Sequence, residues 1–208
     1  HWERPLKKAD WVAIENRCLD LLRNDTKDLQ VAAWLLEAWL RQRGLAGLQQ
    51  GLVLLTQLVL NYWDSVHPTM EDGDADARVA PFEWLNDALP LWLKLHITLV
   101  ELADRKPPRL NLADWEKMTA TELVADPDAE DASSAEPPVE PEFTRTMVIQ
   151  LASLGSAQQV CTQMALTQAC LDAAHDLDVA IRAHLASDAP SLGRITQGLE
   201  QLLRVYKQ

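Results

Sequence analysis

The sequence has 208 residues, of which 48% are hydrophobic and 24% are charged, and its formal net charge is −12. This length and composition suit a globular protein with one large domain or two smaller ones. The negative balance argues against binding to nucleic acids or anionic membranes, because both require clustered Lys and Arg. No apolar run approaches the roughly 20 residues that a membrane-spanning helix needs.

The start of the chain and its cysteines add two expectations. The sequence begins His1-Trp2 without an initiator Met or a signal-peptide pattern, so we expect a fragment of a longer protein. The three cysteines (Cys18, Cys161 and Cys170) show no CxxC spacing, which favours free thiols in a reducing compartment.

The first predicted helix starts after Asp10, which can act as its N-cap, and ends at Asn24-Asp25. A helical hairpin is predicted next, over residues 24–68. Asp25 or Thr26 can cap its first helix, and Gly44 stands where a left-handed C-terminal cap is expected. The second helix restarts at Leu45 and reaches Trp63. Two amphipathic helices with so short a connection must lie side by side and antiparallel. Their predicted inner faces are Leu29, Ala32, Ala33, Leu36, Trp39 and Leu40, and Leu48, Leu52, Leu55, Val59, Tyr62 and Trp63.

Residues 64–80 are predicted to form an acidic surface loop, followed by a helix that has Pro81 in its first turn. Pro90 should kink or end this helix. Another helix is then predicted to contain Leu91, Trp92, Leu95, Leu99 and Leu102, and Asn111 can cap a short helix that contains Trp115.

A change in composition divides the remaining chain. Residues 119–143 hold eight acidic side chains and no Lys or Arg, while all eight tryptophans precede this segment. We therefore predict a helical domain at 1–118, an acidic linker rich in Pro, Ala and Ser at 119–142, and a helical middle domain at 143–208. That second domain should contain a long helix at about 160–185 with a bundle-like seam, and a last helix from Ser191. No β pattern is evident, so the predicted fold class is all-α.

No catalytic motif is present, and we predict neither a metal nor a cofactor. Glu37 is predicted to pair with Arg41 four residues on, and His96 to be packed or hydrogen-bonded. The acids of residues 71–76 lack the bidentate Glu that an EF-hand calcium loop requires, so a solvated loop is the favoured interpretation. The tryptophans at helical spacing, Trp34 among them, are predicted to be core residues, although an aromatic binding groove is the alternative. Gly47 and Gly51 indicate close approach by another backbone or a large ring.

The hairpin contains the motifs Thr26-Lys27-Asp28-Leu29, Gly44-Leu45-Ala46-Gly47-Leu48 and Tyr62-Trp63-Asp64, with Pro68 just beyond. In combination, these motifs resemble the ImpA N-terminal family, which includes the TssA proteins of bacterial type VI secretion systems. The resemblance covers about residues 5–120, and residues 143–208 are similar to the helical middle region of such proteins. Asp87 departs from the family pattern, in which Gly often follows Leu-Asn. The family-motif positions in this sequence are Thr26, Lys27, Asp28, Leu29, Trp34, Glu37, Gly44, Gly47, Leu48, Gly51, Trp63, Asp64, Pro68, Arg78, Leu85 and Asn86.

The resemblance implies a non-catalytic, cytoplasmic assembly protein without a cofactor. Its implied partners are the baseplate, tube, sheath and membrane-complex proteins of the secretion system, and the full-length protein would be a homo-oligomer. Two alternatives remain at the level of the sequence. One is an α-helical enzyme that uses Glu37, His96 or the acids at 71–76, and the other is a helical adaptor of an unrelated pathway.

Overall fold

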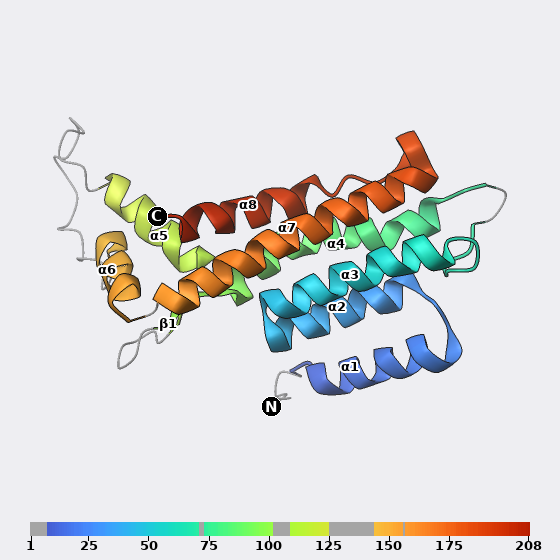
Figure 1. Ribbon diagram of the computed structural model, residues 1–208, viewed down its shortest axis with the longest axis horizontal. Coiled ribbons are helices and arrows are strands. Elements are labelled where there is room, and N and C mark those ends of the chain that lie inside the picture. Colours follow the sequence, from blue (N-terminus) through green and yellow to red (C-terminus); the bar gives the residue numbers. More distant parts are fainter. Residues whose placement is uncertain (1–7, 71–72, 102–108, 125–143, 156) are drawn as a thin grey trace, which may run out of the picture.

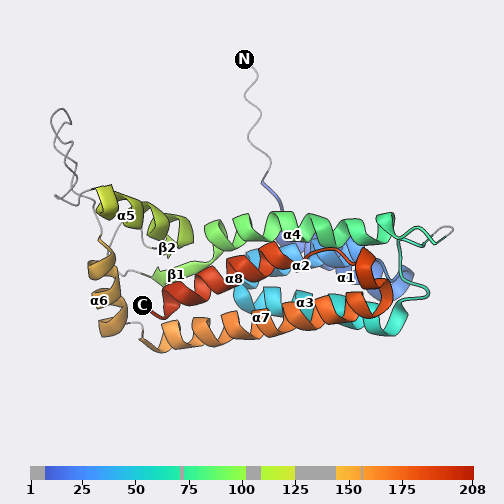
Figure 2. The same cartoon turned by 90° about the horizontal axis from the view of Figure 1, so that it is seen from above.

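A computed structural model describes residues 8–70, 73–101, 109–124, 144–155 and 157–208. The molecule is an elongated bundle in which α2, α3, α4, α7 and α8 lie along the long axis (Figure 1). Strands account for only seven of the described residues, so the predicted all-α class is confirmed apart from one short hairpin. The helix α5 and the helix α6 lie at one end of the bundle together with the C-terminus (Figures 1 and 2).

The first helix, α1 (Trp11–Asp20), begins as predicted, because Asp10 accepts a hydrogen bond from the backbone N–H of Ala13. It continues into a π-helical turn over Leu21–Asp25. The predicted cap of the next helix was wrong. Asp28, rather than Asp25 or Thr26, caps α2 (Leu29–Arg43) by accepting from the N–H of Val31 at 3.0 Å.

Helices α2 and α3 (Leu45–Tyr62) form the predicted antiparallel hairpin. Gly44 joins them with a φ of 60°, which favours glycine at this position. A Cβ at Gly47 would overlap the carbonyl of Trp39, and one at Gly51 would lie 2.7 Å from the Cβ of Leu36. The two glycines therefore permit the close approach of α2 and α3 that their spacing predicted.

The helix α4 (Asp76–His96) begins inside the predicted loop of residues 64–80, and Pro81 lies beyond its first turn, so both of these predictions were wrong. The helix also contains Pro90, so the prediction of two helices separated at Pro90 was wrong. The predicted continuation through Leu99 and Leu102 was wrong as well. The chain leaves the helix at Ile97 and forms β1 (Thr98–Glu101), which pairs antiparallel with β2 (Arg109–Asn111). Asn111 then accepts from the N–H of Asp114 at the start of α5 (Leu112–Val124), as predicted.

The predicted second domain contributes α6 (Arg145–Gly155), α7 (Ala157–Leu185) and α8 (Gly193–Tyr206), with a 3-10 turn at Ala186–Asp188. The helix α7 packs along α3, and α8 packs along both α4 and α7. Side chains on both sides of residues 119–142 join one hydrophobic core, which includes Leu48, Leu52, Phe82, Leu89, Leu177 and Leu199. The first six residues of the predicted linker belong to α5, and the rest lies outside the described residues.

Candidate protein-docking surface

Arg78 organises the loop that links α3 to α4. Its side chain is buried and donates hydrogen bonds to three backbone carbonyls, those of Trp63, Val66 and Pro68, at 2.8 to 2.9 Å. Burial lowers the pKa of Arg78, and the negative charge of Asp64 opposes this shift. The guanidinium is therefore an internal clamp on the loop and is not available to a partner.

The ring of Trp63 lies between two basic side chains. The guanidinium of Arg78 stands 4.8 Å from its centroid, and the imidazole of His184 on α7 stacks on it at 4.4 Å. Further along the loop, the backbone of His67 pairs with the backbone at the start of α2. The backbone N–H of His67 donates a hydrogen bond to the carbonyl of Lys27, and the backbone N–H of Leu29 donates one to the carbonyl of His67. These contacts connect the loop that follows α3 to α2, α4 and α7.

Other predicted motif positions also have structural roles. Asn86 on α4 accepts from the backbone N–H groups of Arg194 and Ile195, so it caps α8 from a different element. The backbone N–H of Thr26 donates a hydrogen bond to the carbonyl of Leu21, and the ammonium group of Lys27 donates one to the carbonyl of Leu22. Fully buried leucines complete the set: Leu29, Leu48 and Leu85.

Trp34 was predicted to be a core residue, and this prediction was wrong, because its side chain is 48% exposed. Its neighbours on the helix, Ala33 and Leu35, are fully buried, so Trp34 points outward from a helix that is otherwise packed on most sides. Glu37 and Arg41 follow it at spacings of three and seven residues. On an α-helix these three positions share one face.

Arg41 is the centre of that face. It forms the predicted ion pair with Glu37 at 3.0 Å, and its guanidinium lies 5.1 Å from the ring of Trp11 and 5.5 Å from the ring of Trp92. It also contacts the Nε2 of His96, as the prediction of a hydrogen-bonded histidine required. We call these six residues from α1, α2 and α4 the Trp34–Arg41 face: Trp11, Trp34, Glu37, Arg41, Trp92 and His96.

The surroundings of His96 in the Trp34–Arg41 face lower its pKa, so its imidazole stays neutral over a wider pH range than that of an ordinary histidine. Desolvation lowers the pKa of His96, and the adjacent positive charge of Arg41 lowers it further. Glu37 and His96 both contact Arg41, so the fold brings them near each other, as an enzymatic interpretation would need. The guanidinium of Arg41 nevertheless stands between them. Neither residue lines any of the three cavities described in this structure.

Sequence reasoning named Trp34 and Glu37 but missed the central place of Arg41 and its contacts with Trp11 and Trp92. Spacing alone puts Trp34, Glu37 and Arg41 on one face, whereas the contacts from α1 and α4 depend on tertiary packing. Of the predicted acidic loop, Asp74 and Asp76 are exposed and residues 71–72 lie outside the described residues. Within the described ranges, no three His, Cys, Asp or Glu side chains are grouped as metal ligands.

No described helix is long and apolar enough to cross a membrane. Residues 3–87 match the family described as "ImpA, N-terminal, type VI secretion system". The chain is 34% identical over 70 residues to the type VI secretion system component TssA1 of Pseudomonas aeruginosa; the match covers 34% of this chain and 20% of that protein. The matched segment thus spans about a fifth of the length of this relative.

The fold is also similar to a solved structure, the N-terminal domain of the TssA component from Burkholderia cenocepacia, which includes its conserved ImpA_N region. The TM-score is 0.81 at 26% identity, and the match covers 98% of this chain and 79% of that one. On these matches residues 3–87 are an ImpA N-terminal region of the type VI secretion system, and the chain has the fold of the N-terminal domain of a TssA component.

Proposed function

We propose that this chain is a non-catalytic docking component that contacts baseplate, tube or sheath proteins while the contractile tail is primed and polymerised. The observation that carries the proposal is the exposed Trp34 on the same helix face as Arg41, whose guanidinium is flanked by Trp11 and Trp92. Among the tryptophans that the structure describes, Trp34 is the one left largely open to solvent. Trp and Arg are the side chains that most often dominate binding energy at protein interfaces.

The Trp34–Arg41 face suits docking because its cation is held in place before a partner arrives. Stacking against the rings of Trp11 and Trp92, together with the ion pair to Glu37, restricts the rotamers of Arg41. A pre-ordered side chain loses less conformational entropy on binding. The exposed indole of Trp34 supplies apolar area that an interface would bury.

Further parts of the proposal follow from membership of the family. We propose that the full-length protein is cytoplasmic and forms a homo-oligomer. We also propose that it contacts the membrane complex of the secretion system. The formal charge of −12 supports partners other than nucleic acid, since DNA and RNA require a basic surface.

The two alternatives receive less support. A catalytic use of Glu37 and His96 would require a recess that admits a substrate, and neither residue lines a described cavity. An adaptor of an unrelated pathway would explain the exposed Trp34 equally well, but the match of residues 3–87 favours a secretion component.

The test is a binding assay in which the immobilised chain is presented with purified baseplate, tube, sheath and membrane-complex proteins. We expect at least one of them to be retained, and Trp34→Ala to weaken that affinity by about thirtyfold, the effect of losing an interface hot spot of about 2 kcal/mol. Val179→Ala on α7 removes another exposed apolar side chain and should bind like the wild type. If folded wild-type protein retains none of the components, the proposed function is wrong.

A further inference from the structure

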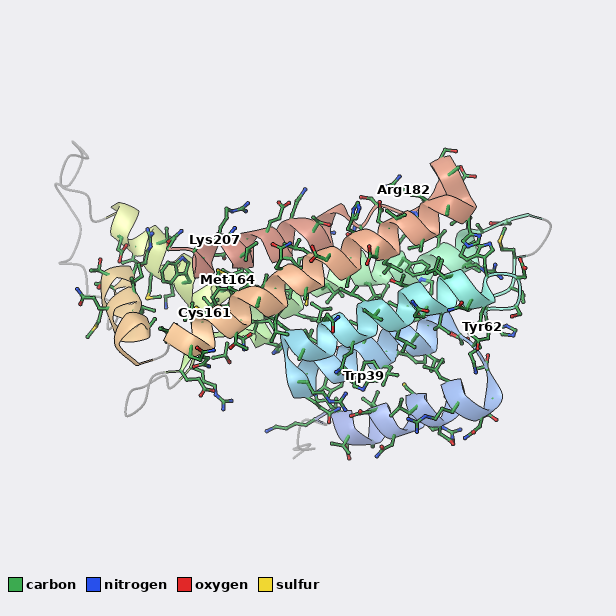
Figure 3. All side chains as sticks on the ribbon, viewed as in Figure 1. Trp39, Tyr62, Cys161, Met164, Arg182 and Lys207 are labelled. Atoms are coloured by element: carbon green, nitrogen blue, oxygen red, sulfur yellow. The ribbon has the colours of Figure 1, made fainter. Side chains whose placement is uncertain are left out.

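A recess lies between α1 and α3. The helix α1 packs against α2, and α2 packs against α3, whereas α1 and α3 make little direct contact. Figure 1 shows α2 between α1 and α3. The space between α1 and α3, over the surface of α2, is a groove of about 280 Å³, which we call the α1–α3 groove. Figure 3 labels two of its residues, Trp39 between α2 and α1, and Tyr62 at the far end of α3.

The groove has apolar walls and a basic end. Leucines of α1, α2 and α3, among them Leu19, Leu35 and Leu54, line it together with the ring of Trp39. Among the residues that the structure describes, its only charged lining residues are Arg23 and Lys27, in a chain whose formal charge is −12. The indole N–H of Trp39 is already used in a hydrogen bond to Glu15, so the aromatic surface of this ring is what the groove presents.

The two basic residues differ in their availability. Lys27 is occupied, because its ammonium donates to the Leu22 carbonyl at 2.6 Å and lies 5.8 Å from the centroid of the Tyr62 ring. Arg23 is exposed and makes no hydrogen bond or ion pair with any residue in the described ranges. The groove thus offers one free cation, beside a second one that adds to the local positive potential.

The surface next to the groove continues its apolar character. None of the 18 residues of α3 is charged, and its outer side exposes Val53 by 40% and Leu60 by 55%. An uncharged outer side is unusual for a surface helix, which normally carries charged residues opposite its buried stripe. An open apolar strip between two helices, rather than a closed pocket with converging polar groups, is the geometry that accepts another helix.

We propose that the α1–α3 groove binds one amphipathic α-helix of a partner protein, with Asp or Glu at the end of that helix that meets Arg23 and Lys27. The apolar stripe of the partner helix would cover Leu54 and Trp39, in the position of a further helix of the bundle. Charge complementarity selects an acidic helix, and the same complementarity disfavours a basic one. The inference rests on the proposed docking function and gives it a second surface with a defined partner chemistry.

The experiment uses a fluorescent 16-residue probe peptide with Leu on one helical face and Glu elsewhere, and a matched peptide with Lys in place of Glu. Binding to the whole chain is followed by fluorescence anisotropy. We expect the Glu peptide to bind at least about tenfold more tightly than the Lys peptide. Arg23→Glu should weaken Glu-peptide binding about fivefold to tenfold, since it exchanges an attraction for a repulsion, and it should strengthen Lys-peptide binding.

Two control variants locate the effect. Arg204→Glu reverses an exposed charge on α8 and should leave Glu-peptide affinity unchanged. Gln57→Glu, which places an acid inside the groove without removing a buried contact, should weaken the Glu peptide as Arg23→Glu does.

Several results would overturn the inference. One is equal binding of the two peptides, and another is no effect of Arg23→Glu. A third is a dimer of the chain in sedimentation that Arg23→Glu abolishes, which would make a second copy the occupant. The outcome is separable from the proposed function: retention of a secretion component that depends on Trp34 but not on Arg23 would keep the docking role and reject the groove.

Discussion

At the scale of single residues, Trp34 and Trp92 show how one residue type serves two roles. Both recur at helical spacing among apolar neighbours, yet Trp34 is 48% exposed and Trp92 is 8% exposed. The ring of Trp92 packs edge-on against Trp84 and under the guanidinium of Arg41. Periodicity cannot separate the two, because it shows that side chains share a face but not whether another helix covers it.

Replacement of each ring by alanine should therefore have unequal effects on stability. We expect Trp92→Ala to cost about 3–5 kcal/mol, the usual loss for a buried ring, and Trp34→Ala to cost less than about 1 kcal/mol. Urea unfolding followed by circular dichroism measures both. A loss for Trp34→Ala that matches that of Trp92→Ala would show that the Trp34 indole is part of the core.

Glu15 gives a pH-dependent prediction. Burial alone would raise its pKa, but hydrogen bonds from Trp39, Gln42 and Arg43 outweigh that effect and lower the pKa below its ordinary value of 4.5. A lowered pKa in the folded state means that the carboxylate stabilises the fold above pH 4.5. This contribution is lost as the pH falls through the lowered value.

Glu15→Gln should consequently destabilise the protein by about 2 kcal/mol at about pH 7, and the difference from the wild type should shrink towards about pH 3. Denaturant midpoints across that range provide the measurement. Glu83→Gln, at an exposed position on α4, serves as the control and should show no such convergence. A difference between wild type and Glu15→Gln that stays constant with pH would mean that the Glu15 charge does not hold α1 on α2.

At the scale of elements, the spacing of apolar residues predicted where most helices lie, but it predicted less well where each helix begins and ends. Pro90 was expected to interrupt a helix, but α4 passes through it. The cost of an interior proline is about 3 kcal/mol, and the packing of α8 on this part of α4 offsets it. Gly198 of α8 lies directly over Pro90, since a Cβ there would stand 3.6 Å from the Pro90 Cα. That contact joins residues far apart in sequence.

The motif residues also depend on contacts between residues that are far apart in the sequence. Arg78 and Asn86 could be named from the resemblance, but their reasons lie in tertiary contacts. Arg78 reaches back to carbonyls 10 to 15 residues earlier, and Asn86 caps a helix 108 residues further on. No local propensity encodes such partners. The Trp34–Arg41 face was out of reach for the same reason, because three helices contribute to it.

The contact between α2 and α3 yields a prediction at this scale. In Gly51→Ala the new methyl would lie 2.7 Å from Leu36 Cβ and 3.0 Å from its Cα, so the hairpin must open. We expect a net loss of about 2 kcal/mol, because overpacking exceeds the gain in helix propensity of about 1 kcal/mol. Gly198→Ala is the matched control. Its nearest neighbour is the end of the Leu93 side chain at 3.3 Å, a milder contact that offsets part of the gain in helix propensity, so its stability should change by less than about 1 kcal/mol.

At the scale of the whole molecule, the division at residues 119–142 stays a proposal about how the chain is built. Composition sets that segment apart, while α7 and α8 from beyond it pack along α3 and α4. We therefore propose two sequence regions that share one core. In this arrangement His184 on α7 stacks on Trp63, and Asn86 of α4 caps α8, so motif positions in the first region hold the second one in place.

Limited proteolysis tests this arrangement. Trypsin is unsuitable, since residues 119–143 contain no Lys or Arg, so a protease of broad specificity such as proteinase K is required. We expect the first cut within residues 119–143, because few apolar side chains are present there to hold the backbone in a core. The two fragments should then elute together in size-exclusion chromatography, because the interfaces of α3 with α7 and of α4 with α8 remain intact. Early cuts within α7 would place the boundary elsewhere, whereas fragments that separate without denaturant would mean that each region folds around a core of its own.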